Sequence, residues 1–179
     1  MRPLPRARRQ GDPREVARAI PLLAQLSPEA LRQLLGVARM QQRPAGVPVI
    51  TRGAPADGAF LIVRGSLRGI VEGPGAPQDD VRGPGGVLGE VALLTGAPYS
   101  ATVVSTQPVT LLHIPQEPFS ALRAQGAPAA TGLLRILGPL VAARVRQTAT
   151  RIDDIFRPDD RGASPIERAF LARDPRSRA

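Results

Sequence analysis

The chain has 179 residues and a formal net charge of +9, and 42% of its residues are hydrophobic while only 3% are aromatic. This composition supports one domain of ordinary size whose core is built from aliphatic side chains. The chain has no cysteine and a single histidine, which excludes disulfides and thiolate metal sites and leaves too few imidazoles for a histidine-rich site. We therefore expect no metal, no cofactor and no enzyme activity.

All 24 basic residues are arginine. A strongly basic chain can be attracted to nucleic acid or to acidic lipid, although codon bias in a GC-rich genome explains the preference for arginine more simply. No apolar run approaches the ~18 residues of a membrane span, and no signal-peptide core follows the N-terminal arginines. The sequence predicts a cytoplasmic protein without a membrane partner.

The N-terminal part divides into a tail and the start of a domain. Residues 1–13 are rich in arginine and proline and are expected to form a basic disordered arm. A domain of helix and β-roll is expected over residues 14–127, with a short helix near residues 14–19. A second helix is predicted to begin at Ser27, because a serine cap, a proline in the first turn and the carboxylate of Glu29 follow one another there.

The middle of the chain has the pattern of short strands. Apolar runs alternate with turns that are rich in glycine and proline. The runs occupy residues 47–50, 59–63, 67–71, 102–104 and 109–114. Such regular spacing favours an antiparallel roll. The expected fold class is mainly β with flanking helices: an antiparallel β-roll or jelly roll followed by a long C-terminal helix.

Helical periodicity returns after the last of these runs. A short helix is expected near residues 119–123, and a long one over residues 128–156, bent at Gly138 and Pro139. An aliphatic stripe on the long helix favours a lid or a homodimer interface, with folding back onto its own roll as the alternative. The interface residues are Leu133, Leu137, Leu140, Val141 and Val145.

A polar tail is expected over residues 157–179. It carries one short helix that begins at Ser164, because Ser164 and Glu167 have the spacing of a capping box. Ile166 and Phe170 lie on this helix. We expect them either to cap the fold or to dock onto a protein partner, so that residues 164–173 are the candidate partner segment.

One segment of the roll resembles a known ligand-binding motif. Residues 85–103 have the sequence GGVLGEVALLTGAPYSATV. This resembles the phosphate-binding cassette of the cyclic-nucleotide-binding domain family, the effector domain of catabolite-activator type, whose usual form is F-G-E-[LI]-A-[LI], a short gap, then P-R-[AST]-A-[ST]-V. Leu88 and Tyr99 depart from it, so the cassette is degenerate. The likeness continues over residues 45–65 and 111–119 and covers about two thirds of the chain.

The resemblance implies ligand-binding roles for eight residues: Gly89, Glu90, Val91, Ala92, Tyr99, Ser100, Ala101 and Thr102. A helix that begins near Gly89 would direct backbone N–H groups and a positive helix end toward an anion. In the family the glutamate accepts a hydrogen bond from the ribose 2′-hydroxyl, and the threonine hydroxyl adds a phosphate contact. A hydroxyl at the position of Ser100 often favours guanine over adenine.

Tyr99 stands where the family has its phosphate-binding arginine. A phenol offers one neutral donor in place of a charged fork, so losing a bidentate pair weakens binding ~100-fold or more. Three outcomes remain open: a cassette kept only for folding, weak binding of a cyclic nucleotide such as cyclic AMP or cyclic GMP, or another anionic ligand held by Arg82 or by an arginine of the long helix.

These features favour a stand-alone, non-enzymatic regulatory module that binds cyclic nucleotides weakly or not at all and acts through protein–protein contacts. The alternative is a genuine cyclic-nucleotide sensor. A transcription factor of catabolite-activator type needs a helix-turn-helix after the long helix, and only about 24 residues follow Ile155, so no sequence-specific DNA binding is expected. The basic tails allow nonspecific contacts with nucleic acid. His113 is expected to pack at the edge of the roll.

Overall fold

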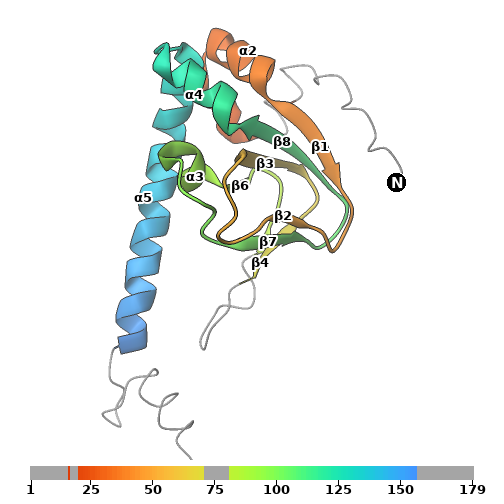
Figure 1. The fold of residues 1–179 in the computed structure, drawn as a ribbon, viewed down its shortest axis with the longest axis vertical. Helices are drawn as coiled ribbons and strands as arrows, with labels where there is room; N and C mark the ends of the chain where they lie inside the picture. The colour runs from red at the N-terminus through yellow and green to blue at the C-terminus, as the bar shows by residue number, and fades with distance from the viewer. Residues whose placement is uncertain (1–15, 17–19, 71–80, 157–179) are drawn as a thin grey trace, which may run out of the picture.

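A computed structural model describes residues 16, 20–70 and 81–156 of the chain. A β-roll lies beside one long helix, and shorter helices cover one end of the roll (Figure 1). The elements, in chain order, are η1 (Pro21–Gln25), α2 (Pro28–Val37), β1 (Arg39–Arg43), β2 (Pro48–Ile50), β3 (Gly58–Arg64), β4 (Leu67–Ile70), β5 (Val81–Arg82), β6 (Val87–Leu88), α3 (Glu90–Thr95), β7 (Thr102–Ser105), β8 (Val109–Pro115), α4 (Gln116–Ala124) and α5 (Pro128–Phe156). This architecture confirms the predicted fold class.

The strands form two antiparallel four-stranded sheets, with the orders β1-β8-β3-β6 and β2-β7-β4-β5. All five runs predicted as strands are present, as β2, β3, β4, β7 and β8. Three strands were not predicted: β1, β5 and β6. The sequence of β1 is RMQQR, which has no run of apolar residues, and β5 and β6 have only two residues each, too few to show an alternating pattern.

Two apolar clusters hold the domain together, one on each face of the sheet that contains β3 and β8. Leu111 packs between the two sheets and Leu112 packs toward the helices, because successive strand residues point to opposite faces. Phe119 of α4 and Leu133 of α5 are fully buried in the helical cluster. The first half of α5 is therefore part of the same core as the roll and its preceding helices.

The predicted start of α2 is confirmed. Ser27 is the N-cap, and its hydroxyl accepts a hydrogen bond from the backbone N–H of Ala30 at 3.2 Å. Leu34 and Leu35 of this helix are buried. This cap satisfies one of the backbone donors that a helix leaves unpaired at its first turn, and it fixes where the chain enters the helical cluster.

The long helix divides into two parts with different surroundings. Leu133 and Leu137 are 0% and 1% exposed and lie in the chain's own core; this part of α5 follows the alternative in which the helix folds back onto its roll. These two leucines are therefore not accessible to a second copy of the chain. Of the predicted dimer face, Leu140, Val141 and Val145 remain, and Val145 is 62% exposed. The last turns of α5 extend past the roll (Figure 1).

The segment Pro128–Arg146 of α5 is, by length and composition alone, apolar enough to cross a membrane, with a mean hydropathy of 1.2. It is not an uninterrupted apolar run of the kind sought in the sequence, because Arg135 and Arg144 interrupt it. The first half of this segment supplies core side chains against α2 and α4, as a core helix of a globular domain does.

Several predictions lie outside the described residues. They are the disordered arm at residues 1–13, most of the short helix near residues 14–19, and the tail over residues 157–179 with its partner segment 164–173. Val16 alone of the first of these helices is described, and it is buried. These predictions stay predictions.

The backbone at Gly58 leaves no space for a side chain. A Cβ there would lie 2.1 Å from the carbonyl oxygen of Ile114, and the φ angle is +146°. We expect Gly58→Ala to destabilise the domain by about 3 kcal/mol or more, measured by urea unfolding. Gly46→Ala is the matched control, because Gly46 also has a positive φ, of +77°, but open space around it; it should cost about 1 kcal/mol. Equal losses would contradict the steric argument.

Candidate functional site

The turn from β6 into α3 is built around Gly89. Its φ angle is +70°, a left-handed conformation that favours glycine. A Cβ at this position would lie 2.8 Å from the carbonyl oxygen of Gly58 and 2.9 Å from Cε1 of Tyr99. The cassette can therefore approach β3 this closely only with glycine at the turn. The helix that was predicted to begin near Gly89 is confirmed as α3.

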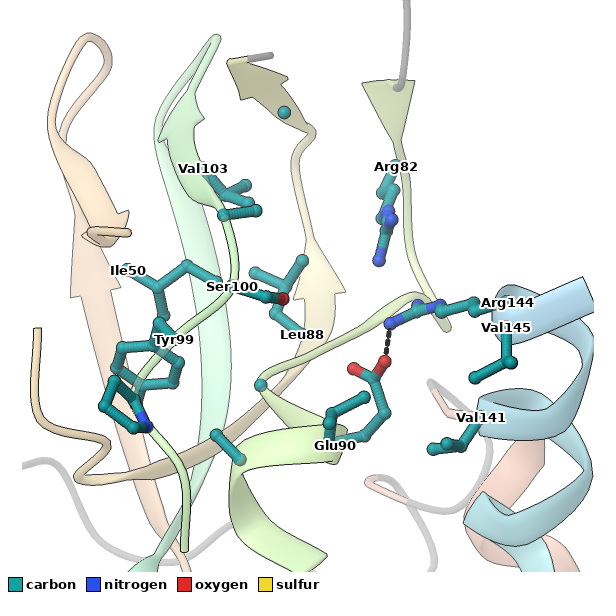
Figure 2. A pocket seen from close by; sticks show the side chains of 16 residues that line it. Ile50, Arg82, Leu88, Glu90, Tyr99, Ser100, Val103, Val141, Arg144 and Val145 are labelled. Atoms are coloured by element: carbon teal, nitrogen blue, oxygen red, sulfur yellow. Dashed lines mark hydrogen bonds and ion pairs between the residues drawn. The ribbon is translucent and has the colours of Figure 1, made fainter. Parts of the chain in front are cut away.

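A cavity of about 490 Å³ lies between this turn and α5. Figure 2 shows its walls: the cassette and the strands on one side, and α5 on the other. Seven of the eight predicted ligand-binding residues line it, together with the predicted charge at Arg82. The seven are Gly89, Glu90, Val91, Ala92, Tyr99, Ser100 and Ala101. Its size lies in the usual range for small-molecule sites.

Thr102 is the eighth predicted residue and is not among those that line the cavity. Its hydroxyl accepts a hydrogen bond from the backbone N–H of Arg52 at 3.0 Å. Because this contact ties β7 to the segment after β2, the hydroxyl has a structural partner already. The structure therefore places Thr102 outside the cavity lining, at the start of β7, and gives its hydroxyl an anchoring contact.

Tyr99 is buried, and its hydroxyl is directed into the protein. The phenol oxygen lies 2.5 Å from Oδ1 of Asp57 and 2.8 Å from the carbonyl oxygen of Gly58, two acceptors that share its proton. It also accepts from the backbone N–H of Asp57 at 3.2 Å. Burial, and then the neighbouring Asp57 carboxylate, raise the pKa of Tyr99 well above its usual value. The phenol thus remains neutral and does not replace the missing arginine in the cavity.

A guanidinium enters the cavity from α5 instead. Nη1 of Arg144 forms an ion pair with Oε1 of Glu90, as drawn in Figure 2, and Nη2 donates to the carbonyl oxygen of Val87 at 2.8 Å. Nη1 of Arg82 donates to the same carbonyl at 3.0 Å. The sequence allowed for an arginine of the long helix but did not identify which one. The available signal was spacing, because Arg144 is one helical turn from Val141 and adjoins Val145.

A second polar group is buried behind the cassette. His113 is 7% exposed and stacks on the ring of Phe60 with 4.5 Å between the ring centroids. Its Nε2 lies 3.2 Å from the carbonyl oxygen of Asp57, and its Nδ1 lies 3.0 Å from Nε2 of Gln41. The amide nitrogen of Gln41 is a donor only, so Nδ1 must be the acceptor of this hydrogen bond. The proton of the neutral ring is therefore on Nε2.

The predicted edge position of His113 was wrong. The residue lies on β8, which has β1 on one side and β3 on the other. The strand pattern alone did not show that a polar segment, Arg39–Arg43, pairs outside β8. Burial is the main cause that lowers the pKa of His113 below its usual value, against the opposing effect of Asp57.

The lowered pKa of His113 predicts how the stability of the domain depends on pH. The folded state keeps His113 neutral where the unfolded chain takes up a proton, so stability falls as the pH drops below about 6.5 toward the folded-state pKa, by at most about 1.4 kcal/mol per pH unit. We expect the free energy of unfolding between pH 7.5 and 5.5 to fall more steeply for the wild type than for His113→Gln. His113 is the chain's one histidine, so equal slopes would contradict the assignment.

Comparison with known proteins gives a consistent result. Residues 40–125 match the model of a family described as cyclic nucleotide-binding domain. A cyclic nucleotide-gated potassium channel from Mesorhizobium japonicum is 33% identical over 108 residues, which are 60% of this chain and 29% of the channel. The matched region spans only between 27% and 34% of the length of this channel and of other curated relatives.

Solved structures share the fold. A cyclic nucleotide-binding domain from Methylobacillus flagellatus superposes with a TM-score of 0.68 at 23% identity, over 80% of this chain and 85% of that one. The catabolite activator protein of Thermus thermophilus superposes with a TM-score of 0.61 at 27% identity, over 74% of this chain and 62% of that one. The roll, the cassette helix and the long helix are thus a recurring arrangement.

Proposed function

Residues 40–125 of this chain belong to the cyclic nucleotide-binding domain family, and we propose that the chain is a non-enzymatic regulatory module that binds a cyclic mononucleotide weakly. The observation that carries this proposal is the cavity of about 490 Å³ between the cassette and α5. Tyr99 leaves it open, because the phenol is held by Asp57 and Gly58 on the far side of the ring. The module then acts on other proteins through its surface.

Weak binding follows from the loss of the cassette arginine. Hydrogen bonds to charged groups contribute about 1.5–3 kcal/mol each, and a neutral phenol turned away from the cavity supplies none of this to a phosphate. A loss of this size corresponds to about 100-fold in the dissociation constant. A genuine sensor with tight binding is the alternative, and affinity separates the two.

The cavity offers positive charge to an anion. The guanidinium groups of Arg82 and Arg144 line it, together with the carboxylate of Glu90. A cyclic phosphodiester carries one negative charge, with which a guanidinium can form charge-assisted hydrogen bonds. Ser100 also lines the cavity, and by the resemblance noted above its hydroxyl favours a guanine base.

The other parts of the proposal concern location and partners. The domain contains no helix-turn-helix among its described elements, and we do not assign it sequence-specific DNA binding. We place the module in the cytoplasm, outside the membrane. The basic arm and the candidate partner segment 164–173 lie outside the described residues, so contacts through them, with nucleic acid or protein, stay predictions.

Restoring the missing guanidinium tests the ligand. We expect Tyr99→Arg to bind cyclic AMP or cyclic GMP about 10- to 100-fold more tightly than the wild type in calorimetry, because a charged fork replaces a neutral donor. Tyr99→Phe is the matched control and should leave the affinity unchanged. No gain in Tyr99→Arg would mean that the cavity does not hold a cyclic nucleotide. A wild-type dissociation constant below about 10 µM would favour the genuine sensor.

Dimerisation through α5 is the second testable part. Val145 is the most exposed aliphatic residue of the predicted face, and burying an aspartate there against a second copy would be costly. We expect the wild type to sediment as a dimer and Val145→Asp as a monomer. Thr131→Asp serves as the control, because Thr131 is an exposed position near the start of the same helix, far from Val145. A monomeric wild type at about 100 µM would exclude the proposed dimer.

A further inference from the structure

The second half of α5 has little apolar anchoring. Between residues 138 and 146 no side chain is buried, whereas the first half of the helix is held by buried side chains such as Leu133 and Leu137. Leu140 and Val141 are half-buried, and Val145 is 62% exposed. Apolar burial is the main force that docks a helix onto a domain, and here it nearly ends at Leu137.

The two halves of α5 meet at a weak point in the helix. Pro139 lies inside α5, and proline has no N–H to donate to the carbonyl of the preceding turn, here that of Arg135. Gly138 precedes it, and glycine restricts the backbone least. A helix is most easily bent at such a position, so residues 140–146 need an additional contact to stay against the cassette.

A buried carboxylate supplies that contact. The side chain of Glu90 is only 4% exposed, and its Oε1 pairs with Nη1 of Arg144, whose side chain is 32% exposed. The same guanidinium donates through Nη2 to the carbonyl of Val87 at 2.8 Å. A buried charge without a partner is strongly unfavourable, so the pair joins the start of α3 to α5 more firmly than a surface ion pair would.

We propose that Glu90 and Arg144 form a latch that keeps the second half of α5 docked on the cassette when no ligand is present. Glu90 does in the free protein what a bound anion would do: it gives the guanidinium of Arg144 a negative partner in the cavity. Glu90 is in this respect a positioning residue for α5. A regulatory role for the latch rests on the proposed function, because α5 forms one wall of the cavity in which the ligand is proposed to bind.

The latch has a direct consequence for the response to a ligand. The carboxylate that the cassette would offer to a ribose hydroxyl already has a charged partner in the free protein. A ligand that binds Glu90 must therefore replace the existing Glu90–Arg144 ion pair. Its binding free energy is smaller than it would be in a domain without this pair. Because α5 is already docked in the ligand-free protein, it presents the same surface to a partner without a ligand.

Amide hydrogen exchange of the ligand-free, full-length chain tests the latch, read residue by residue by NMR. We expect protection factors of residues 140–146 to fall about tenfold in Glu90→Gln and in Arg144→Gln. Residues 129–137 should keep wild-type protection, which also shows that the domain is folded. The double variant should lose no more than either single variant, because both remove the same interaction.

Arg135→Gln is the matched control, because Arg135 is an exposed arginine of the same helix; it should leave protection in residues 140–146 unchanged. Unchanged protection in both single variants, or losses in the double variant equal to the product of the two single losses, would overturn the latch. No ligand is present in this experiment, so its failure is separate from the failure of ligand binding, which the calorimetry on Tyr99→Arg decides.

Discussion

The close approach of the cassette turn to β3 is the constraint on which the site depends. At Gly89 the carbonyl of Gly58 and the ring of Tyr99 occupy the space that any side chain would need. The left-handed turn then starts α3 so that Glu90 is buried at the cavity wall. The hydrogen bonds from the Tyr99 hydroxyl to the β3 side of this contact hold the ring in place. Cavity, carboxylate and phenol are thus positioned by one packing contact.

The distribution of charge at the cavity follows from this packing. The cassette contributes a carboxylate and a neutral phenol, and positive charge comes from β5 and from α5 through Arg82 and Arg144. Charge supplied by the cassette itself would act independently of the long helix. Charge supplied by α5 is present only while that helix lies against the roll, so any anion bound by Arg144 is linked to the position of α5. A weakly packed helix end is well suited to such coupling.

Local patterns were sufficient to predict the main elements. The serine cap and proline at Ser27 fixed the start of α2, and apolar runs between glycines located five strands; the resemblance of residues 85–103 to the family's cassette located the turn into α3. These features depend on neighbours within a few residues of one another. The strand Arg39–Arg43 was missed for the opposite reason: it is a strand because β8 lies beside it, and its polar sequence carries no signal of that pairing.

Spacing and residue type encode turns, caps and periodic faces, and these patterns were enough to predict a β-roll followed by a long helix; the altered cassette was recognised by its resemblance to a known motif. Three contacts became visible only in the folded chain: the Tyr99 hydroxyl binds Asp57, the Thr102 hydroxyl anchors the segment after β2, and Arg144 pairs with Glu90. Those contacts join positions 40 to 55 residues apart. Their geometry depends on how the sheets and α5 pack, which no local pattern specifies.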